Sequence, residues 1–425
     1  MKFAIISDTH FGDNTCTLVK KSGQKKIRIV KGDKFDAFVE AAGTGNKYLV
    51  MAGDIFDFSI APYEEAYAYG RAFFRWVRDK GIADEIIYIA GNHDADLWHI
   101  IQHQRSVINR IKNKKMPKPF AHSVAGIIDD RKNSPTAGFW LNKVKARTTG
   151  ESKYGNMFLD HIAGDGNPIP FNFAYPNLYI ATDTDTVMVT HGQYLEPYWS
   201  LVGELGAKTL YDDLKIGEMD MEELVELNFP LNQLACTGLG QAGCLTPVLR
   251  QVELEAKAGN VARLEKYLGR LNKELDRMLE YGWIKEYICD RLLKEGQAQI
   301  LEAVRKLKNT RYMEEFIHKP EVKKRFADFY NASLLEIAAI NEEPQQFGGA
   351  CFNLQAPERI IFGHTHQPVA WDAPDALKLN MISSVLPKRL RLFNTGGWLT
   401  EGGKFCGAEV FTYETGTGFA STRIN

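Results

Sequence analysis

The chain has few cysteines, and they are not arranged in pairs. Six cysteines are spread over 425 residues without the short spacings of a disulfide framework. We therefore expect reduced thiols and a cytoplasmic protein. Cys236 and Cys244 are the nearest pair, but a zinc knuckle there would need two further ligands nearby.

Long apolar runs are also absent from the sequence. No run approaches the roughly 18 residues that span a membrane. The amino terminus turns acidic at Asp8 after a short apolar run, and it lacks the apolar core and the cleavage site of a signal peptide. We expect neither a transmembrane segment nor a secretion signal.

The chain has almost no net charge, because 52 basic residues balance 53 acidic residues to give −1. No global field therefore draws it to nucleic acid or to an anionic membrane. The sequence is instead rich in core-forming residues, with 44% hydrophobic and 11% aromatic side chains. Its length and composition predict two or three domains and a large buried core.

Five apolar, strand-like runs are each followed at once by Asp, Asn or His. The clearest run is 85–90, which precedes Gly91-Asn92-His93-Asp94. Polar side chains that follow strands in this way gather at the carboxyl edge of an open α/β sheet. The residues that the five runs deliver are Asp8, His10, Asp54, Asn92, His191, His364 and His366.

These side chains predict a metal centre. Carboxylate, imidazole and amide oxygen without thiolate suit divalent ions such as Mn, Fe, Zn, Co or Ni. The set is too large for one ion and suits two, if one carboxylate bridges them. Two ions roughly 3.5–4 Å apart hold a hydroxide for in-line attack at phosphorus, so we expect hydrolysis of a phosphate ester.

Together the motifs resemble those of the calcineurin-like metallophosphoesterase family. The family pattern runs Asp-x-His, Gly-Asp-x-x-Asp, Gly-Asn-His-Asp/Glu, His and Gly-His-x-His, and this chain carries the set in that order. The resemblance covers about 1–200 and 346–425. It implies a metal-dependent phosphoric ester hydrolase of the α/β class, with two mixed sheets face to face and helices outside them in a four-layer αββα sandwich.

The resemblance also implies how the ligands are divided between two metal ions. One ion would take Asp8, His10 and His366. The other would take Asn92, His191 and His364, and Asp54 would bridge the two ions.

His93 is expected to act on the substrate rather than to bind metal. By its place in the motif it would stabilise the phosphoryl oxygens or protonate the leaving group, while Asp57 holds its ring. The sequence supports these roles independently. His93 stands beside Asn92 on a glycine turn, and Asp57 lies three residues beyond Asp54 on one loop, within reach of the second ring nitrogen.

His99 and His103 receive a different interpretation. They are spaced i, i+4 on an expected helix, but Ile100-Ile101-Gln102 stands between them where a zinc-protease motif requires a Glu. We interpret the pair as helix packing or as a side wall of the cleft.

The amino-terminal part of the chain alternates strands with helices. Helices are expected at 33–42 and 63–80, which favours βαβ units and a largely parallel sheet. Residues 114–176 are rich in proline, glycine and asparagine and predict long loops. The runs 178–181 and 187–189 predict a hairpin.

From about residue 212 to residue 343 the pattern becomes helical and charged. One expected helix carries an apolar seam formed by Leu264, Leu268, Leu271, Leu275 and Met278. A second helix at 284–307 could pair with it as an antiparallel hairpin. We expect 212–343 to be an insertion, acting as a cap or an arm, in a core of 1–211 and 344–425. The seam forms the insertion's own core, a homo-oligomer contact or a lipid-facing groove.

The sequence is compatible with more than one class of substrate. Phe58 stands where Ser/Thr protein phosphatases place a phosphate-gripping Arg, which disfavours that branch. The run 53–58, His191-Gly192, the insertion and the run 397–402 resemble the UDP-2,3-diacylglucosamine hydrolase branch, which cleaves a pyrophosphate. A small phosphomonoester, phosphodiester or nucleotide is at least as compatible with the motifs. A non-catalytic scaffold that kept the fold is a hypothesis of a different class.

Overall fold

The computed structural model describes most of the chain. The described residues are 1–23, 28–142, 157–162, 169–210, 215–241, 320–343, 351–371, 377–382 and 387–425, with 243, 251, 255, 260, 262–267, 269, 270 and 349.

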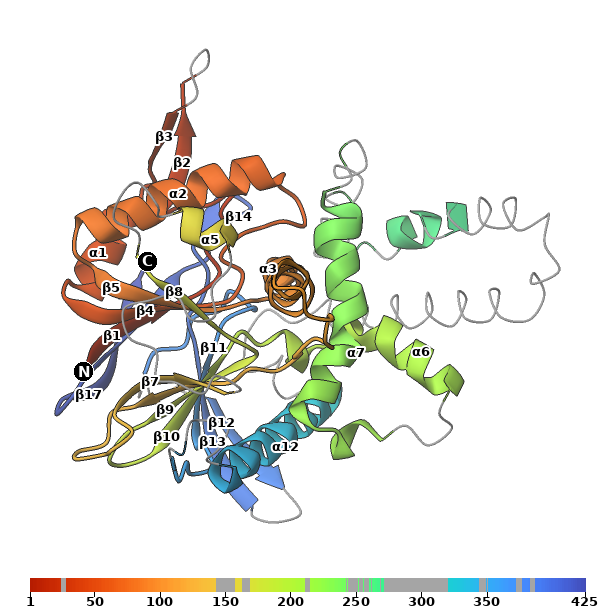
Figure 1. The fold of residues 1–425 in the computed structure, drawn as a ribbon. Coiled ribbons are helices and arrows are strands. Elements are labelled where there is room, and N and C mark those ends of the chain that lie inside the picture. The colour runs from red at the N-terminus through yellow and green to blue at the C-terminus, as the bar shows by residue number, and fades with distance from the viewer. Residues whose placement is uncertain are drawn as a thin grey trace.

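Two large mixed sheets form the centre of the fold (Figure 1). The first has the order β17-β16-β1-β4-β5-β8. Its strands are β1 (Lys2–Ile6), β4 (Asn46–Ala52), β5 (Ala83–Ile89), β8 (Phe171–Ala174), β16 (Ala408–Glu414) and β17 (Gly418–Ile424). Strands β1, β4, β5 and β8 are parallel, as the alternation of strands and helices predicts, and β16 and β17 add an antiparallel edge.

The second sheet has the order β12-β13-β11-β10-β9-β6-β7. Its strands are β6 (Gly126–Asp129), β7 (Gly138–Leu141), β9 (Asn177–Ala181), β10 (Thr186–Thr190), β11 (Arg359–Phe362), β12 (Leu377–Ile382) and β13 (Pro387–Asn394). Strands β9 and β10 form the predicted hairpin, with Thr186 opposite Ala181. Strand β11 pairs in parallel with β10 although more than 150 residues of sequence separate them. The chain therefore returns to the same sheet after the expected insertion.

Helices cover the outer faces of both sheets, so the predicted sandwich of two mixed sheets between helices is confirmed. Helices α1 (Phe35–Ala42) and α2 (Tyr63–Asp79) lie over the first sheet, and α12 (Pro320–Glu342) lies under the second (Figure 1). The Tyr179 hydroxyl on β9 donates to Glu336 Oε2 on α12 at 2.7 Å. Helix α12 is therefore an outer layer of the core, although its sequence lies inside the segment expected to be an insertion.

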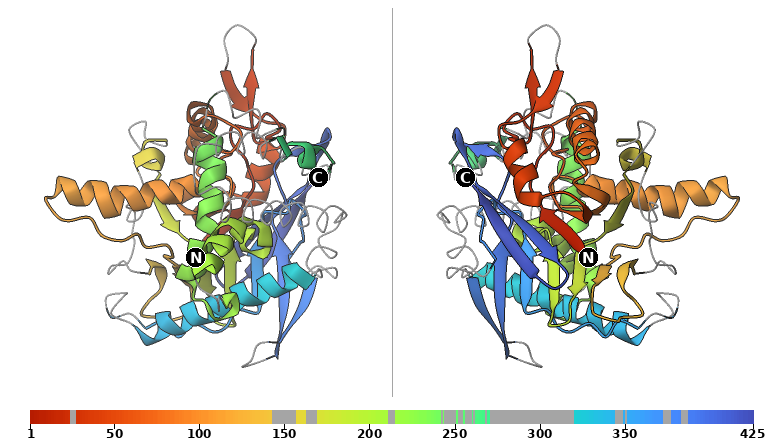
Figure 2. Two further views of the ribbon diagram at one scale, coloured as in Figure 1. Left: turned by 90° about the vertical axis from the view of Figure 1, so that its right-hand side faces the viewer. Right: turned by 90° about the vertical axis from the view of Figure 1, so that its left-hand side faces the viewer.

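Smaller elements complete the described chain. These are β2 (Val19–Ser22), β3 (Arg28–Lys31), β14 (Thr400–Glu401), β15 (Lys404–Phe405), α3 (Ala95–His103), η1 (Gln104–Ile108), α4 (Asn109–Lys112), α5 (Met157–Ile162), η2 (Gln193–Leu195), η3 (Pro197–Ser200), α6 (Leu201–Leu210), η4 (Ile216–Glu218), α7 (Met221–Gln233) and η5 (Leu234–Leu239). The β2–β3 hairpin projects from the body on the side opposite α12 (Figure 2).

The predicted leucine seam falls mostly outside the described residues. Leu264 is described and buried, whereas Leu268, Leu271, Leu275, Met278 and the expected helix 284–307 lie in the part that is not described. Within the described residues, no helix has the length and apolar character needed to cross a membrane.

The central strands of the first sheet are buried on both faces. All but one residue of β4 and all but one of β5 are buried, as their apolar runs 48–52 and 86–89 predict for strands covered by helices on one side and a second sheet on the other. This rigid centre fixes the position of the loops that leave the strand ends.

Candidate metal centre

Loops from both sheets meet at one edge of the fold. The loops after β1 and β4 are joined by the Asp8 amide, which donates to the Gly53 carbonyl at 2.9 Å. The loops after β10 and β11 are joined by the Gly363 amide, which donates to the His191 carbonyl at 2.9 Å. Each loop begins where a parallel strand ends, so strands far apart in sequence deliver their polar side chains to one place.

The first group of side chains consists of Asp8, His10 and His366, whose candidate ligand atoms lie within 4.8 Å of one another. His10 Nε2 lies 3.3 Å from His366 Nε2, and His366 Nε2 lies 3.3 Å from Asp8 Oδ1. All three of these residues are candidate ligands from the sequence, and they come from loops at opposite ends of the chain.

The second group consists of Asp54, His191 and His364, again within 4.8 Å. His191 Nε2 lies 3.1 Å from Asp54 Oδ2 and 3.2 Å from Asn92 Oδ1. Asp54 Oδ2 also lies 3.8 Å from His10 Nε2, so this carboxylate stands between the two groups. The structure thus brings together all seven side chains singled out at the strand ends.

Each of the four histidines has an acceptor at one ring nitrogen. His10 Nδ1 lies 2.9 Å from Asp57 Oδ2, and His191 Nδ1 lies 3.0 Å from the Ala52 carbonyl. The other two pairs are His364 Nε2 with Glu196 Oε2 at 2.8 Å and His366 Nδ1 with Glu401 Oε1 at 3.1 Å. In a neutral imidazole the nitrogen beside the acceptor carries the proton, and the other nitrogen then has a lone pair.

The resulting lone pairs face other acceptors. Nε2 of His10 faces Nε2 of His366, and Nε2 of His191 faces the side-chain oxygens of Asp54 and Asn92. Opposed lone pairs at 3.1–3.3 Å repel one another unless a proton or a cation lies between them. The donor set of carboxylate, imidazole and amide oxygen therefore fits divalent metal ions.

The charges of the buried carboxylates support the same interpretation. Burial alone would raise the pKa of Asp54, but the charges of His191 and His93 hold it well below its usual value. Burial likewise opposes ionisation of Asp57, whose pKa is held well below its usual value by His93 and His10. Among the described residues, all ion pairs of Asp8, Asp54 and Asp57 are with histidines. When these histidines are neutral, the negative charge of the three carboxylates must be balanced by bound cations.

The backbone at the site adopts uncommon conformations. Five of the seven candidate ligands have positive φ, with 52° at Asp8, 46° at His10, 51° at Asp54, 66° at His364 and 54° at His366. Such angles are costly for residues other than glycine and concentrate at functional sites. At Gly53 and Gly363 a Cβ atom would overlap the His191 ring and the Asp8 carboxylate, so close packing of the loops requires glycine there.

His93 stands at the edge of the two groups, with 14% of its side chain exposed. Its Nδ1 lies 3.0 Å from Asp57 Oδ1, and the Ser59 hydroxyl donates to the same oxygen at 2.6 Å. Asp57 Oδ2 also contacts His10, a link that the sequence did not predict. Asp57 therefore joins His93 to a candidate metal ligand instead of serving His93 alone.

Sequence reasoning missed the role of Asp94. Its buried carboxylate accepts from the Ile55 amide at 2.8 Å, from the Gly91 amide at 2.6 Å and from the Tyr88 hydroxyl. Burial and the charge of Asp54 raise the pKa of Asp94 to about 6. Asp94 thus ties the loop after β4 to the loop after β5, and its place in the Gly-Asn-His-Asp motif was the available signal.

Glu196 was also missed, since no motif or spacing in the sequence connects it to His364. Its contact with His364 Nε2 leaves Nδ1 as the ring nitrogen that could bind an ion in the second group. Glu196→Ala is expected to weaken metal binding by about 10–100-fold, because a carboxylate partner orients a histidine ligand and raises its basicity. Calorimetric titration of metal-free protein with Mn²⁺ measures the change.

Glu196→Gln provides the conservative variant, since its amide oxygen still accepts from His364 and should preserve more of the affinity. Glu218→Ala is the matched control, because the Glu218 side chain is 71% exposed and pairs with Lys215 on the surface. An unchanged Mn²⁺ affinity in Glu196→Ala would show that His364 does not need this partner.

A family model described as calcineurin-like phosphoesterase matches residues 1–194. This segment runs from β1 into η2 and includes the loops that carry Asp8, Asp54, Asn92 and His191. No curated protein matches the chain.

Proposed function

The first 194 residues belong to the calcineurin-like phosphoesterases, a family of metal-dependent hydrolases, and we propose that the chain acts as a dinuclear enzyme on a small phosphoester. The observation that carries the proposal is the set of opposed lone pairs on either side of Asp54. They favour one cation among Asp8, His10 and His366 and a second among Asn92, His191 and His364, with Asp54 shared. When bound, the two ions would activate water and neutralise charge on the phosphoryl oxygens.

The chain's own residues would orient the substrate and move the proton. Asp57 accepts from His93 Nδ1, which leaves Nε2 of His93 as the nitrogen that can act on a bound phosphoester. In the protonated ring this nitrogen would donate to a phosphoryl oxygen or to the leaving-group oxygen. The Ser59 hydroxyl and Asp57 would hold the ring in that orientation.

We expect the purified protein to bind about two divalent ions per chain and to hydrolyse p-nitrophenyl phosphate or its bis ester. Plasma mass spectrometry measures the metal content, and absorbance at the nitrophenolate band measures hydrolysis. EDTA should abolish the activity and added Mn²⁺ should restore it. A protein that stays metal-free and inert after Mn²⁺ addition would instead support the non-catalytic scaffold.

The segment 212–343, apart from α12, which packs on the second sheet, would serve this enzyme as a cap. Its contacts with the candidate site support the proposal, because the Cys236 thiol donates to the Asn92 carbonyl at 3.1 Å. The Gln241 amide donates to the carbonyls of Phe58 and Ala61 at 2.8 and 2.9 Å. Such contacts would couple the position of the cap to the loops that carry Asn92 and Asp57.

A further inference from the structure

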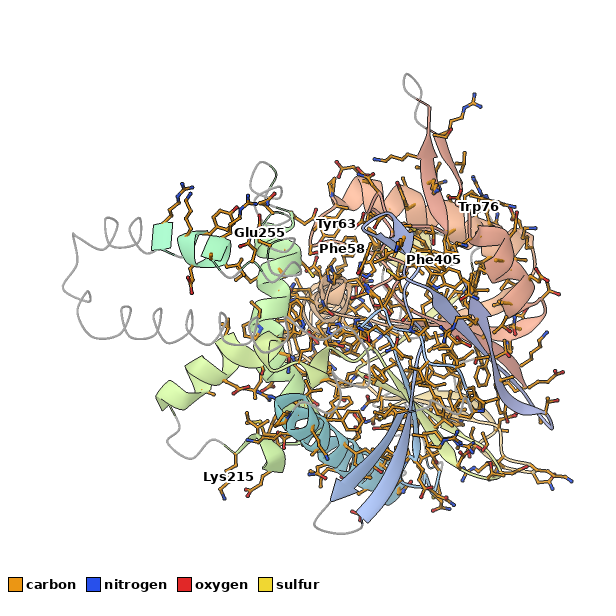
Figure 3. The ribbon with its side chains drawn as sticks, turned by 180° about the vertical axis from the view of Figure 1, so that it is seen from behind. Phe58, Tyr63, Trp76, Lys215, Glu255 and Phe405 are labelled. Atoms are coloured by element: carbon orange, nitrogen blue, oxygen red, sulfur yellow. The ribbon has the colours of Figure 1, made fainter. Side chains whose placement is uncertain are left out.

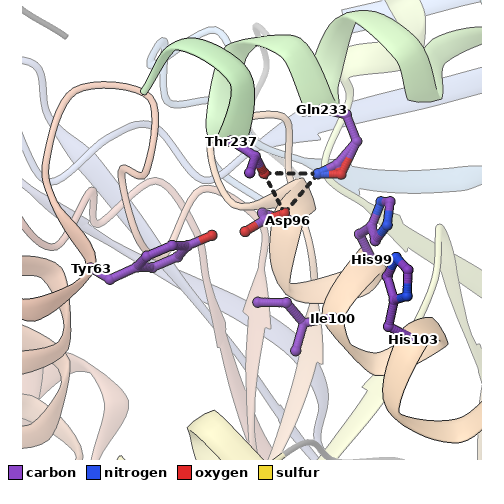
Figure 4. A pocket seen from close by; sticks show the side chains of 7 residues that line it. All are labelled: Tyr63, Asp96, His99, Ile100, His103, Gln233 and Thr237. Atoms are coloured by element: carbon purple, nitrogen blue, oxygen red, sulfur yellow. Dashed lines mark hydrogen bonds between the residues drawn. The ribbon is translucent and has the colours of Figure 1, made fainter. Parts of the chain in front are cut away.

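A pocket of about 470 Å³ lies where the core meets α7 and η5. Helix α3 provides Asp96, His99, Ile100 and His103, and α2 begins with Tyr63 on another side. Gln233 and Thr237 line it from α7 and η5. Figure 4 shows Tyr63 on one side and Ile100 with the two histidines on the other, below the helix that carries Thr237 and Gln233. The volume suits one small organic group.

The pocket lies next to the loops of the candidate metal centre. Helix α3 starts at Ala95, directly after Asn92-His93-Asp94. Thr237 is next to Cys236, whose thiol contacts the Asn92 carbonyl. Phe58, whose amide donates to the His93 carbonyl at 3.1 Å, packs its ring 4.7 Å from that of Tyr63 (Figure 3). The organic part of a phosphoester held near His93 would therefore have this pocket beside it.

Most of the polar groups at the top of the pocket bind one another. Asp96 Oδ1 accepts from the Thr237 hydroxyl at 2.6 Å and from the Gln233 amide at 2.7 Å (Figure 4). These bonds hold η5 and α7 against α3 and occupy Asp96 Oδ1, the Thr237 hydroxyl and the Gln233 amide nitrogen, whereas Gln233 Oε1 and His99 Nδ1 are buried without a hydrogen-bond partner. The surface left for a ligand is largely carbon, from rings and from Ile100.

Aromatic rings dominate that surface. His99 and His103 line the pocket as a stacked pair, with ring centroids 4.4 Å apart and planes inclined by 21°, and Phe229, which does not line the pocket, packs against His99 with centroids 4.9 Å apart. A further planar ring can pack against such a stack in an offset or edge-on arrangement. The Tyr63 hydroxyl points toward Asp96 and offers a hydrogen bond to a polar ring edge (Figure 4). A flexible alkyl chain would use neither the ring planes nor this hydroxyl.

We propose that this pocket binds a planar aromatic ring, such as a nucleobase, in the organic part of the phosphoester. The assignment rests on the proposed phosphoesterase function and adds a substrate class to it. Core and insertion would both select the substrate, because α3 and η5 each provide part of the pocket.

AMP and ribose 5-phosphate test the proposal, since they share the phosphate ester and differ in the base. Their dissociation constants are measured by calorimetry on the Mn²⁺-loaded His93→Ala protein, in which turnover is slowed. AMP is expected to bind about tenfold more tightly, the range of one base stacked on aromatic side chains. Adding Ile100→Trp, which fills the pocket, should remove most of this preference.

Ile111→Trp is the matched control, because Ile111 is 58% exposed and does not line the pocket. It should keep the AMP preference. If Ile100→Trp does not fold, His103→Ala, which removes one ring of the stack, replaces it in the comparison.

Equal binding of AMP and ribose 5-phosphate would overturn the proposal, as would a preference that survives Ile100→Trp. A preference for dodecyl phosphate that Ile100→Trp removes would assign the pocket to an alkyl chain instead. These binding results are independent of hydrolysis. An AMP preference in a protein without phosphatase activity would uphold the pocket and refute the enzyme, whereas hydrolysis without the preference would do the reverse.

Discussion

Asp54→Ala should release metal from both groups and lower kcat/KM by about 10³-fold or more. Asp54 Oδ2 lies 3.1 Å from His191 Nε2 and 3.8 Å from His10 Nε2, so one carboxylate reaches both groups. Without Asp54 both groups would lose the carboxylate that they share, so each would bind its metal ion more weakly. Loss of the ions would remove the several kcal/mol by which bound metal ions stabilise the transition state of phosphoryl transfer. Plasma mass spectrometry and steady-state kinetics on p-nitrophenyl phosphate measure the two effects.

Asp33→Ala is the control for Asp54→Ala, since the Asp33 side chain is 75% exposed and pairs with Lys20 away from the site. Melting temperatures add a test that does not depend on activity. Mn²⁺ should raise the melting temperature of the wild-type protein and of Asp33→Ala, because a ligand that binds the folded state stabilises it. It should raise that of Asp54→Ala much less. An Asp54→Ala protein that keeps two ions would refute the shared carboxylate.

His93→Ala should slow turnover by about 10²–10⁴-fold while the metal content stays unchanged. Its imidazole contacts Asp57 and Ser59 and stands at the edge of the two groups, so its loss removes a proton donor and leaves the proposed ligands in place. The expected kinetic result is a lower kcat with little change in KM. Metal analysis of the same preparation measures the second half of the prediction.

The control for His93→Ala is His161→Ala, which removes an exposed histidine of α5.

Loss of metal in His93→Ala would contradict the prediction that His93 is not a metal ligand. His10, Asp57 and His93 also lie within 4.8 Å of one another and could hold an ion themselves. In that case His93 would be a ligand and the division between ligand and proton donor would be wrong.

The sequence predicted the positions of the polar loops because these depend on local patterns, whereas the sandwich was expected from the resemblance to the family. The runs 48–52 of β4 and 86–89 of β5 are continuously apolar, which is typical of strands in a sheet covered on both faces. A polar motif directly after such a strand must lie at its carboxyl end, whatever the rest of the chain does. Asp54 and Asn92 could therefore be assigned to one edge of a sheet without knowledge of their neighbours.

The tertiary structure alone decided which distant groups touch. Glu196 reaches His364 across 168 positions, and Gln233 reaches Asp96 across 137. Helix α12 is a layer of the core because it covers the face of β9 that carries Tyr179. No local pattern within residues 320–342 indicates this contact.

The sequence by itself determined that two sheets would present acidic and histidine side chains at their strand ends. The fold decided which acceptors these histidines contact, with Asp57 placed between His10 and His93 and an acceptor at one ring nitrogen of each of the four histidines in the two groups. The physical reason is that periodicity specifies which side chains a strand buries and where the strand ends. Hydrogen bonds between loops depend on how the two sheets pack, which is a property of the whole chain.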